Sequence, residues 1–242
     1  MLSITTLEFG KNGRPVSPIQ TKPAASALFL AHGWMSGFDD SAALFSRIRR
    51  QLLRHDAELD LTLYEVCWPS LKFAPASQTP GGAAGLMSGL KGLMNLPFYA
   101  TMKKRAGEIS ARGLAPWLDA FHREHPGTKI HLAGHSFGAR LVTAAAQAAL
   151  CPIESMTLLQ AAFSQFAFSP KGGFRDVVTR RKVRGPILVT HTKRDLAVGV
   201  GYPVASFALR QNASFLIGKE DAYGGLGRNG AQGMLPGECA SL

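Results

Sequence analysis

The chain has 242 residues, of which 46% are hydrophobic and 18% are charged, and this length and composition fit one α/β domain with a sizeable core. Lys and Arg number 27 against 16 Asp and Glu, so the formal net charge is +11, which favours contact with acidic surfaces without naming a partner. Because no zinc-finger spacing and no aromatic RNA-binding strand accompanies this charge, we expect no specific nucleic-acid partner.

Short apolar segments alternate with segments of helical periodicity along the chain. A continuous apolar run such as 27–31 suits a strand that is buried on both faces of a parallel sheet. The segment after it has apolar residues at helical spacing, and Asp39, Asp40 or Ser41 can cap that helix. The predicted strands cover residues 3–9, 27–31, 61–68, 129–133, 156–162 and 187–190. Their alternation with helices predicts a three-layer α/β/α sandwich with a mostly parallel central sheet, in a single domain over residues 1–242.

Residues 70–107 are less regular than the segments on either side of them. Residues 81–98 are apolar and contain many glycines, which fits either a flap over a site or a core-packing helix with loose ends. We therefore treat residues 72–107 as a possible lid, and the core-packing alternative stays open. A longer helix is expected over 106–124, where Pro116 predicts a kink or a restart.

The most informative motif is Gly134-His135-Ser136-Phe137-Gly138, which follows an apolar strand and precedes an Ala-rich helix. A serine at so sharp a turn has a strained backbone, and flanking glycines let the neighbouring backbone pass without a Cβ clash. The hydroxyl then projects above the sheet, close to the N–H groups at the start of the helix, which can stabilise an oxyanion. The alternative is an ordinary Gly-rich turn between a strand and a helix.

This strand, turn and helix resemble the nucleophile elbow of the α/β-hydrolase family of serine hydrolases. The resemblance implies that Ser136 is the nucleophile in the hydrolysis of a small-molecule acyl ester, with no cofactor and no metal. It also implies an oxyanion hole formed by the backbone N–H groups of Trp34 and Phe137, where Gly33 lets the backbone approach closely. The glycines of the elbow itself are Gly134 and Gly138.

In this family an acid follows a later strand and orients the catalytic histidine. Asp195 fits that position, because it lies shortly after the predicted strand 187–190, and a helix N-cap is its alternative role. Asp176 is a second candidate, although it lies in a basic loop where we expect it to pair with an arginine.

The family places the histidine after the acid, but no histidine follows Asp195 in this sequence. His191 lies at the end of the preceding strand and is an alternative base, whereas His32 is expected to orient the oxyanion loop. The Gly-rich residues 218–242 show no strand, where the family has one more. Both observations predict that the last strand and helix of the fold are missing and that catalysis is impaired, since a serine without a base is a poor nucleophile.

Cys67, Cys151 and Cys239 are widely spaced and odd in number, which argues against a disulfide framework or a zinc site and fits a reducing compartment. The N-terminal residues show no signal-peptide pattern, and no apolar run approaches the roughly 20 residues of a transmembrane helix. We expect a cytoplasmic protein whose oligomeric state the sequence leaves open. Three functions follow: an acyl-ester hydrolase, a non-catalytic binding protein of the same fold, and a basic module for acidic surfaces.

Overall fold

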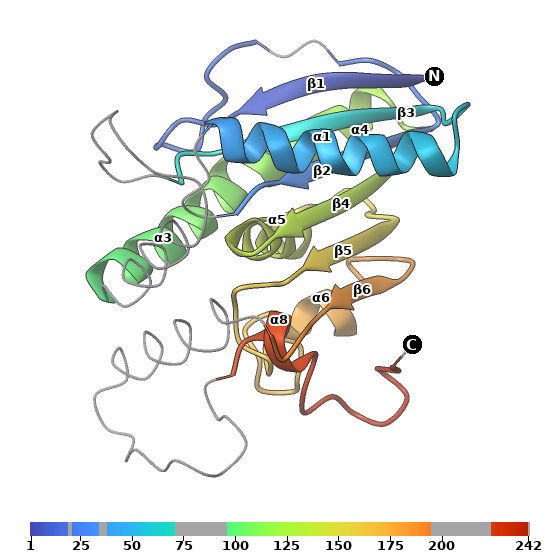
Figure 1. The fold of residues 1–242 in the computed structure, drawn as a ribbon. Coiled ribbons are helices and arrows are strands. Elements are labelled where there is room, and N and C mark those ends of the chain that lie inside the picture. Colours follow the sequence, from blue (N-terminus) through green and yellow to red (C-terminus); the bar gives the residue numbers. More distant parts are fainter. Residues whose placement is uncertain (19–20, 34–37, 71–95, 195–223, 242) are drawn as a thin grey trace.

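The computed structural model describes residues 1–18, 21–33, 38–70, 96–194 and 224–241. Within them, six strands form one sheet in the order β1-β3-β2-β4-β5-β6, and neighbouring strands are parallel. The strands are β1 (Leu2–Glu8), β2 (Ser26–Ala31), β3 (Leu61–Cys67), β4 (Lys129–His135), β5 (Ser155–Leu159) and β6 (Ile187–Thr190). Because the strands are parallel, their carboxyl ends meet at one edge of the sheet, on the left in Figure 1.

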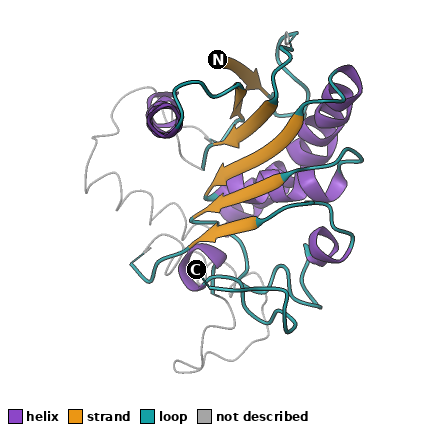
Figure 2. Cartoon of the chain, turned by 90° about the vertical axis from the view of Figure 1, so that its right-hand side faces the viewer, coloured by secondary structure: helices purple, strands orange, loops and turns teal. Residues whose placement is uncertain are grey.

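Helices cover both faces of the sheet and give three layers (Figure 2). One face carries α1 (Phe38–His55), and the other carries α3 (Leu96–Ile109), α4 (Ala115–Glu124), α5 (Phe137–Ala148) and α6 (Arg175–Thr179). A short helix, α8 (Leu226–Asn229), contacts β6. The predicted three-layer α/β fold with a mostly parallel sheet is therefore confirmed.

Side chains that alternate along β2 explain why both faces need helices. Leu30 belongs to a buried cluster with Phe45 of α1, and Leu28 packs against the same cluster. Phe29, which is fully buried, belongs to the larger cluster on the opposite face, together with residues of α3, α4 and α5. Because successive side chains of a strand point to opposite faces, a strand that is apolar at every position is buried on both, as its composition predicted.

Most strands differ from those predicted by one or two residues at an end, and the start of α1 and the end of β5 differ as well. The helix α1 begins at Phe38, so the three residues predicted to cap it lie in its first turn instead of preceding it. The strand β5 ends at Leu159, before the predicted end at Ala162, because Gln160 has a φ of +47°. A positive φ takes the chain out of the extended conformation, so Ala161 and Ala162 leave the sheet although their composition suits a strand.

Pro116 lies where the helical path from Leu96 to Glu124 restarts, which is one of the two predicted alternatives. A π-helical turn, η1 (Ser110–Leu114), separates α3 from α4, and the N–H of Ala115 donates to the carbonyl of Ser110. Pro116 then lies in the first turn of α4. The N–H groups of a first turn have no acceptor within their own helix, so a proline there removes no helical hydrogen bond.

The possible lid over residues 72–107 falls mostly outside the described part of the chain, since residues 71–95 are not described. Its last part belongs to α3, which begins upstream of the helix predicted over 106–124. Met102 and Ala106 of α3 are fully buried in the main core. From Met102 onward, this segment therefore packs as a core helix.

Residues 224–241 pack against the segment that follows β5 and, as expected, contain no strand. Leu226 is fully buried, and its N–H donates to the carbonyl of Phe163 at 2.8 Å. The N–H of Gly227 donates to the carbonyl of Ala161 at 2.9 Å. These bonds hold α8 at the carboxyl edge of the sheet, close to the end of β5.

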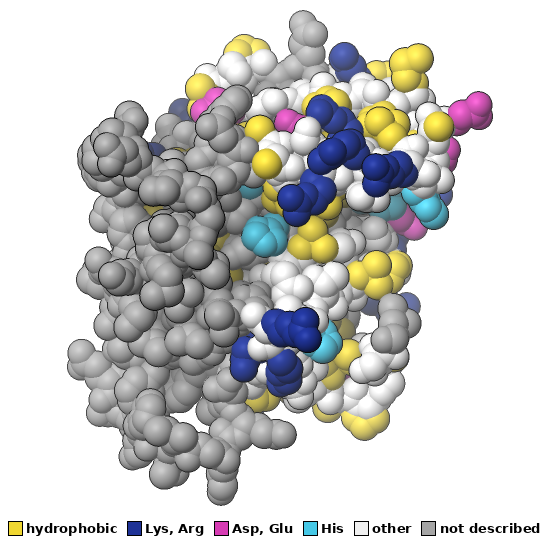
Figure 3. Space-filling view, viewed as in Figure 1, with side chains coloured by type: hydrophobic (Ala, Val, Ile, Leu, Met, Phe, Trp, Pro, Cys, Tyr) yellow, Lys and Arg dark blue, Asp and Glu magenta, His cyan; other side chains and the backbone are white. Residues whose placement is uncertain are grey.

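Basic side chains gather over α1 on the face shown in Figure 3. Arg47, Arg50 and Arg54 of this helix are exposed. Their spacing of three and four residues puts them on one side of the helix, away from the sheet. Part of the positive charge is therefore displayed on an outer helix and not at the carboxyl edge of the strands.

Candidate active site

Ser136 lies at the turn between β4 and α5 with a φ of 55° and a ψ of −117°. Residues other than glycine rarely adopt a positive φ, and such conformations persist only where the surrounding structure enforces them. Here the N–H of Ser136 donates to the carbonyl of Leu159 at 2.9 Å, and its own carbonyl accepts from the N–H of Ala162 at 3.1 Å. The segment after β5 therefore holds the turn in place, and Ser136 remains partly exposed.

The two glycines of the motif are required by close backbone contacts. A Cβ on Gly134 would lie 2.5 Å from the backbone nitrogen of Ala139. A Cβ on Gly138 would overlap the carbonyl oxygens of Ala31 and His32. Because Gly134 has no Cβ, α5 can turn back sharply behind β4. Because Gly138 has none, α5 can pass close to the end of β2.

Gly33 brings the loop after β2 against the turn that carries the serine. A Cβ on Gly33 would lie 3.1 Å from the Cβ of Ser136 and 3.0 Å from the Nδ1 atom of His135. Trp34, the predicted donor of one N–H group, lies outside the described residues. Phe137 is the first residue of α5 and its side chain is buried in the core, so any part it has in the site comes from its backbone.

His32 holds this loop through both ring nitrogens. Its Nδ1–H donates to the carbonyl of Gly33 at 2.8 Å, and its Nε2 accepts from the backbone N–H of Trp68 at 3.2 Å. The indole N–H of Trp68 donates in turn to the carbonyl of His32 at 2.9 Å. Burial lowers the pKa of His32, the hydrogen bond to Gly33 opposes this, and the nearby His135 lowers the pKa further. These contacts agree with the orienting role expected for His32 and require a neutral ring.

Four of the seven histidines lie away from the carboxyl edge of the sheet. His55 ends α1 immediately upstream of β3, and His122 and His125 lie at the end of α4, immediately upstream of β4. His131, within β4, is bonded through its Nδ1 to the hydroxyl of Ser155 at 2.8 Å, where β5 begins. Because the strands are parallel, these histidines belong to the opposite, amino-terminal part of the sheet and cannot serve Ser136.

His135 and His191 are the other two histidines at the carboxyl edge. His135 packs against Gly33, whereas His191 follows β6, two strands from β4 and thus about 10 Å away across the sheet. The ring of His191 lies 3.2 Å from the position of a Cβ on Gly230. All seven histidines belong to the described residues. None of these residues forms a hydrogen bond with the hydroxyl of Ser136.

The structure describes one of the two candidate acids, Asp176, but not the other, Asp195. Asp195 lies outside the described residues, immediately after the last described residue of the segment that follows β6. The carboxylate of Asp176 pairs with the Nε of Arg180 at 3.2 Å on the exposed side of α6. The expectation that Asp176 pairs with an arginine is therefore confirmed.

No sequence pattern predicted the residues that hold the serine turn from the side of β5. Leu159 and Ala162 act only through their backbone, and the turn at Gln160 has no glycine to mark it. A loop that hydrogen-bonds through its main chain leaves no side-chain pattern, so these contacts become visible only in three dimensions.

Metal and membrane motifs are absent from the part of the chain that the structure describes. There, no group of three or more His, Cys, Asp or Glu side chains is placed to hold a metal ion. No helix in the described ranges is long and apolar enough to cross a membrane. The three cysteines are free thiols.

Comparison with known proteins supports the fold. The model of a family described as an alpha/beta hydrolase of unknown function (DUF900) matches residues 16–160. This range includes the loop after β2, the turn at Ser136 and the whole of β5. No match was found among curated proteins or among solved structures. Because the matched range is more than half of the chain, the protein belongs to this family of α/β hydrolases.

Proposed function

We propose that this chain is a serine hydrolase that uses Ser136 to attack the carbonyl carbon of a small acyl ester. The observation that supports this most is the positive φ of Ser136, at a turn where both flanking glycines are required by close contacts. An ordinary strand-to-helix turn needs no such strain. Where strain of about 1–3 kcal/mol persists, a functional reason is a reasonable inference.

In the proposed reaction, the Oγ of Ser136 forms a bond to the carbonyl carbon, and the carbonyl oxygen takes up the negative charge. The backbone N–H groups of Phe137 and Trp34 stabilise this oxyanion, and one such donor typically contributes about 100-fold or more to the rate. The bond to the alcohol oxygen then breaks, and the alcohol takes a proton from water. Water hydrolyses the acyl group on Ser136, which releases the acid and restores the hydroxyl.

The proton of the Ser136 hydroxyl needs an acceptor, and no histidine in the chain is bonded to it. We therefore propose that hydroxide accepts it, so that the reaction is slow and accelerates as the pH rises. Part of the rate enhancement remains, because an oxyanion hole and substrate binding still act when a triad member is missing. Asp195 stays a prediction as the acid that would orient a histidine base, and the reaction with hydroxide makes no use of it.

Labelling with a fluorophosphonate tests the proposal, because this reagent phosphonylates nucleophilic serines. We expect the wild-type chain to gain one label, at a rate that rises with pH, and Ser136→Ala to gain none. Ser17→Ala is the matched control, since Ser17 is exposed but has no positive φ, and it should label like the wild type. Equal labelling of wild type and Ser136→Ala would contradict the proposal.

A non-catalytic binding protein is the second candidate function. The absence of a histidine bonded to Ser136 among the described residues favours it. On this alternative, the wild type remains unlabelled over the whole pH range in which the fold is stable. The fluorophosphonate experiment therefore separates the two candidates directly.

A further inference from the structure

A cavity of about 560 Å³ lies between α3, α5 and the loop that follows β5. The described residues that line it include three basic ones, Lys103 of α3, Arg140 of α5 and Lys171 of the loop. Its described lining residues include no Asp or Glu. A hollow of this size accommodates a small organic ligand, and three cations around it produce a positive potential that favours an anion.

The cavity is connected to the serine turn through two elements. Arg140 follows Ser136 by four residues in α5, a rise of about 6 Å along the helix. Phe163, which also lines the cavity, follows Ala162, whose N–H donates to the carbonyl of Ser136 at 3.1 Å. One wall of the cavity therefore lies about one helical turn from Ser136 along α5.

Aromatic packing fixes the position of the Arg140 guanidinium. Its central carbon lies 5.3 Å from the centroid of the Phe174 ring, and that ring packs edge-on against Phe163 at 5.3 Å. A guanidinium donates hydrogen bonds in its own plane, so contact with a ring face is compatible with donation to a carboxylate or phosphate. This arrangement resembles a prepared anion site more than a solvated surface charge.

The loop that completes the cavity is held by its own backbone. The N–H of Gly172 donates to the carbonyl of Ser169 at 2.8 Å, and the N–H of Phe174 donates to the carbonyl of Ala167 at 2.8 Å. A Cβ on Gly172 would overlap the carbonyl of Ala167, so only glycine allows this close path. The wall that carries Lys171 is therefore formed before any ligand arrives.

We propose that this cavity binds the anionic group of the substrate, so that Ser136 acts on an ester that also carries a carboxylate or a phosphate. This inference rests on the proposed function for the ester part, but anion binding itself does not require an active serine. Lys103, Arg140 and Lys171 bind the anionic group, and the aromatic rings contact the carbon chain that joins it to the ester.

The test is calorimetric titration of inorganic phosphate and of succinate into the full chain that carries Ser136→Ala, at constant ionic strength. This background keeps the cavity and removes the nucleophile, so the result does not depend on the proposed hydrolysis. We expect saturable binding of one or both anions, which identifies the preferred group. Adding Arg140→Gln should weaken that binding about tenfold or more, because a charge-assisted hydrogen bond is lost.

Two further variants keep the test decisive. Lys171→Gln changes an exposed residue, so it should fold even if Arg140→Gln does not, and it should also weaken binding. Arg47→Gln removes an exposed charge from α1, on the other face of the sheet, and should leave binding unchanged. Absence of saturable binding of either anion would overturn the inference, as would equal loss of binding in Arg47→Gln and Lys171→Gln.

Discussion

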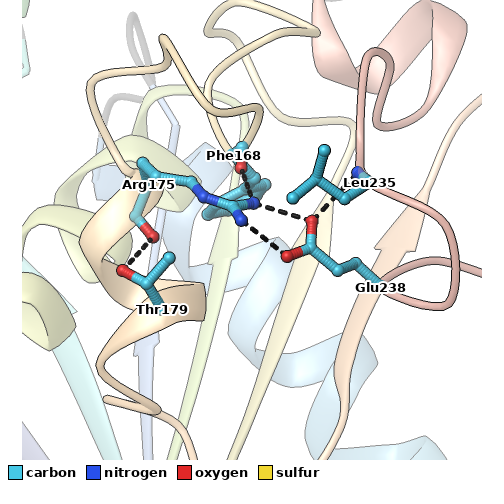
Figure 4. A network of polar contacts seen from close by, with 5 residues as sticks. All are labelled: Phe168, Arg175, Thr179, Leu235 and Glu238. Atoms are coloured by element: carbon cyan, nitrogen blue, oxygen red, sulfur yellow. Dashed lines mark hydrogen bonds and ion pairs between the residues drawn. The ribbon is translucent and has the colours of Figure 1, made fainter.

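The guanidinium of Arg175 and the carboxylate of Glu238 form two hydrogen bonds of 2.7 and 2.6 Å, which join α6 to a turn near the C-terminus (Figure 4). Arg175 also donates to the carbonyl of Phe168 at 3.1 Å, and Glu238 accepts from the N–H of Leu235 at 3.0 Å. The two side chains are only 15% and 22% exposed. The pair therefore ties residues 235–238 to the loop that forms one wall of the basic cavity.

Replacing Glu238 with Gln should lower the melting temperature in a pH-dependent way. Hydrogen bonds from Arg175 lower the pKa of Glu238 below its ordinary value of 4.5, so the folded state binds the proton less readily than the unfolded state. The contribution of the pair is therefore present above pH 4.5 and is lost as the pH falls below it. Melting curves of wild type and variant should differ at neutral pH and converge in acid.

Asp176→Asn is the control for this pair, because the ion pair of Asp176 with Arg180 is far more exposed. Exposed pairs of this kind contribute little to stability, so its melting temperature should stay close to that of the wild type. An Asp176→Asn effect as large as that of Glu238→Gln would contradict the structural importance of the Arg175–Glu238 pair.

Gly138→Ala should destabilise the fold by about 3 kcal/mol or more, since its Cβ would overlap backbone oxygens that cannot rotate away. Urea unfolding measures this change. Gly107→Ala is the matched control, because Gly107 lies within α3 and its Cβ would meet nothing within 4 Å. There, alanine should stabilise the helix by about 0.5–1 kcal/mol. Similar unfolding free energies for the two variants would contradict the close packing of α5 against the end of β2.

Gly33→Ala should affect the reactivity of Ser136 more than the stability of the chain. Its Cβ would lie 3.1 Å from the Cβ of Ser136, so the loop after β2 must shift by a few tenths of an ångström. Small displacements of reacting groups have large effects on rate, and we expect fluorophosphonate labelling to slow by about tenfold. Labelling at the wild-type rate would show that the loop after β2 does not affect the reactivity of Ser136.

His32→Ala should cost about 2 kcal/mol, because the buried N–H of Trp68 loses its acceptor. Burial lowers the pKa of His32 below 6.5, so the unfolded chain takes up a proton near that pH while the folded chain does not. Stability from neutral His32 is therefore full above pH 6.5 and falls as the pH drops toward the folded-state pKa.

Urea unfolding of wild type and His32→Ala on both sides of this pH measures the dependence on His32. His55→Ala, at the exposed end of α1, should change stability by less than about 0.5 kcal/mol at either pH. A His32 ring that titrates in the folded state with its ordinary pKa would contradict its buried, doubly bonded position.

Much of the fold could be predicted because local composition and long-range packing agree. The apolar run at 27–31 is buried on both faces as β2, and the glycines around Ser136 mark a turn that only they permit. Where backbone geometry decides, local composition misleads. Ala161 and Ala162 suit a strand, but the positive φ of Gln160 ends β5 before them.

The candidate site was only partly predictable for a similar reason. Ser136 has a local motif, whereas the basic cavity brings together Lys103, Arg140 and Lys171 from three elements far apart in sequence. In the sequence, each of these residues looks like an ordinary charged residue of the surface. Their common cavity follows from the order of the strands and from the path of the loop after β5, which no short pattern encodes.

The most direct test of the central claim is acetylation of the chain by p-nitrophenyl acetate, followed by mass spectrometry of the intact chain and its peptides. Because no histidine is placed to activate water against an acyl-enzyme, we predict that one acetyl group accumulates on Ser136 and is lost slowly. Ser136→Ala should not acquire this group under the same conditions. Acetylation of Ser136→Ala to the same extent as wild type, on lysines or other side chains, would contradict the assignment of Ser136 as the nucleophile.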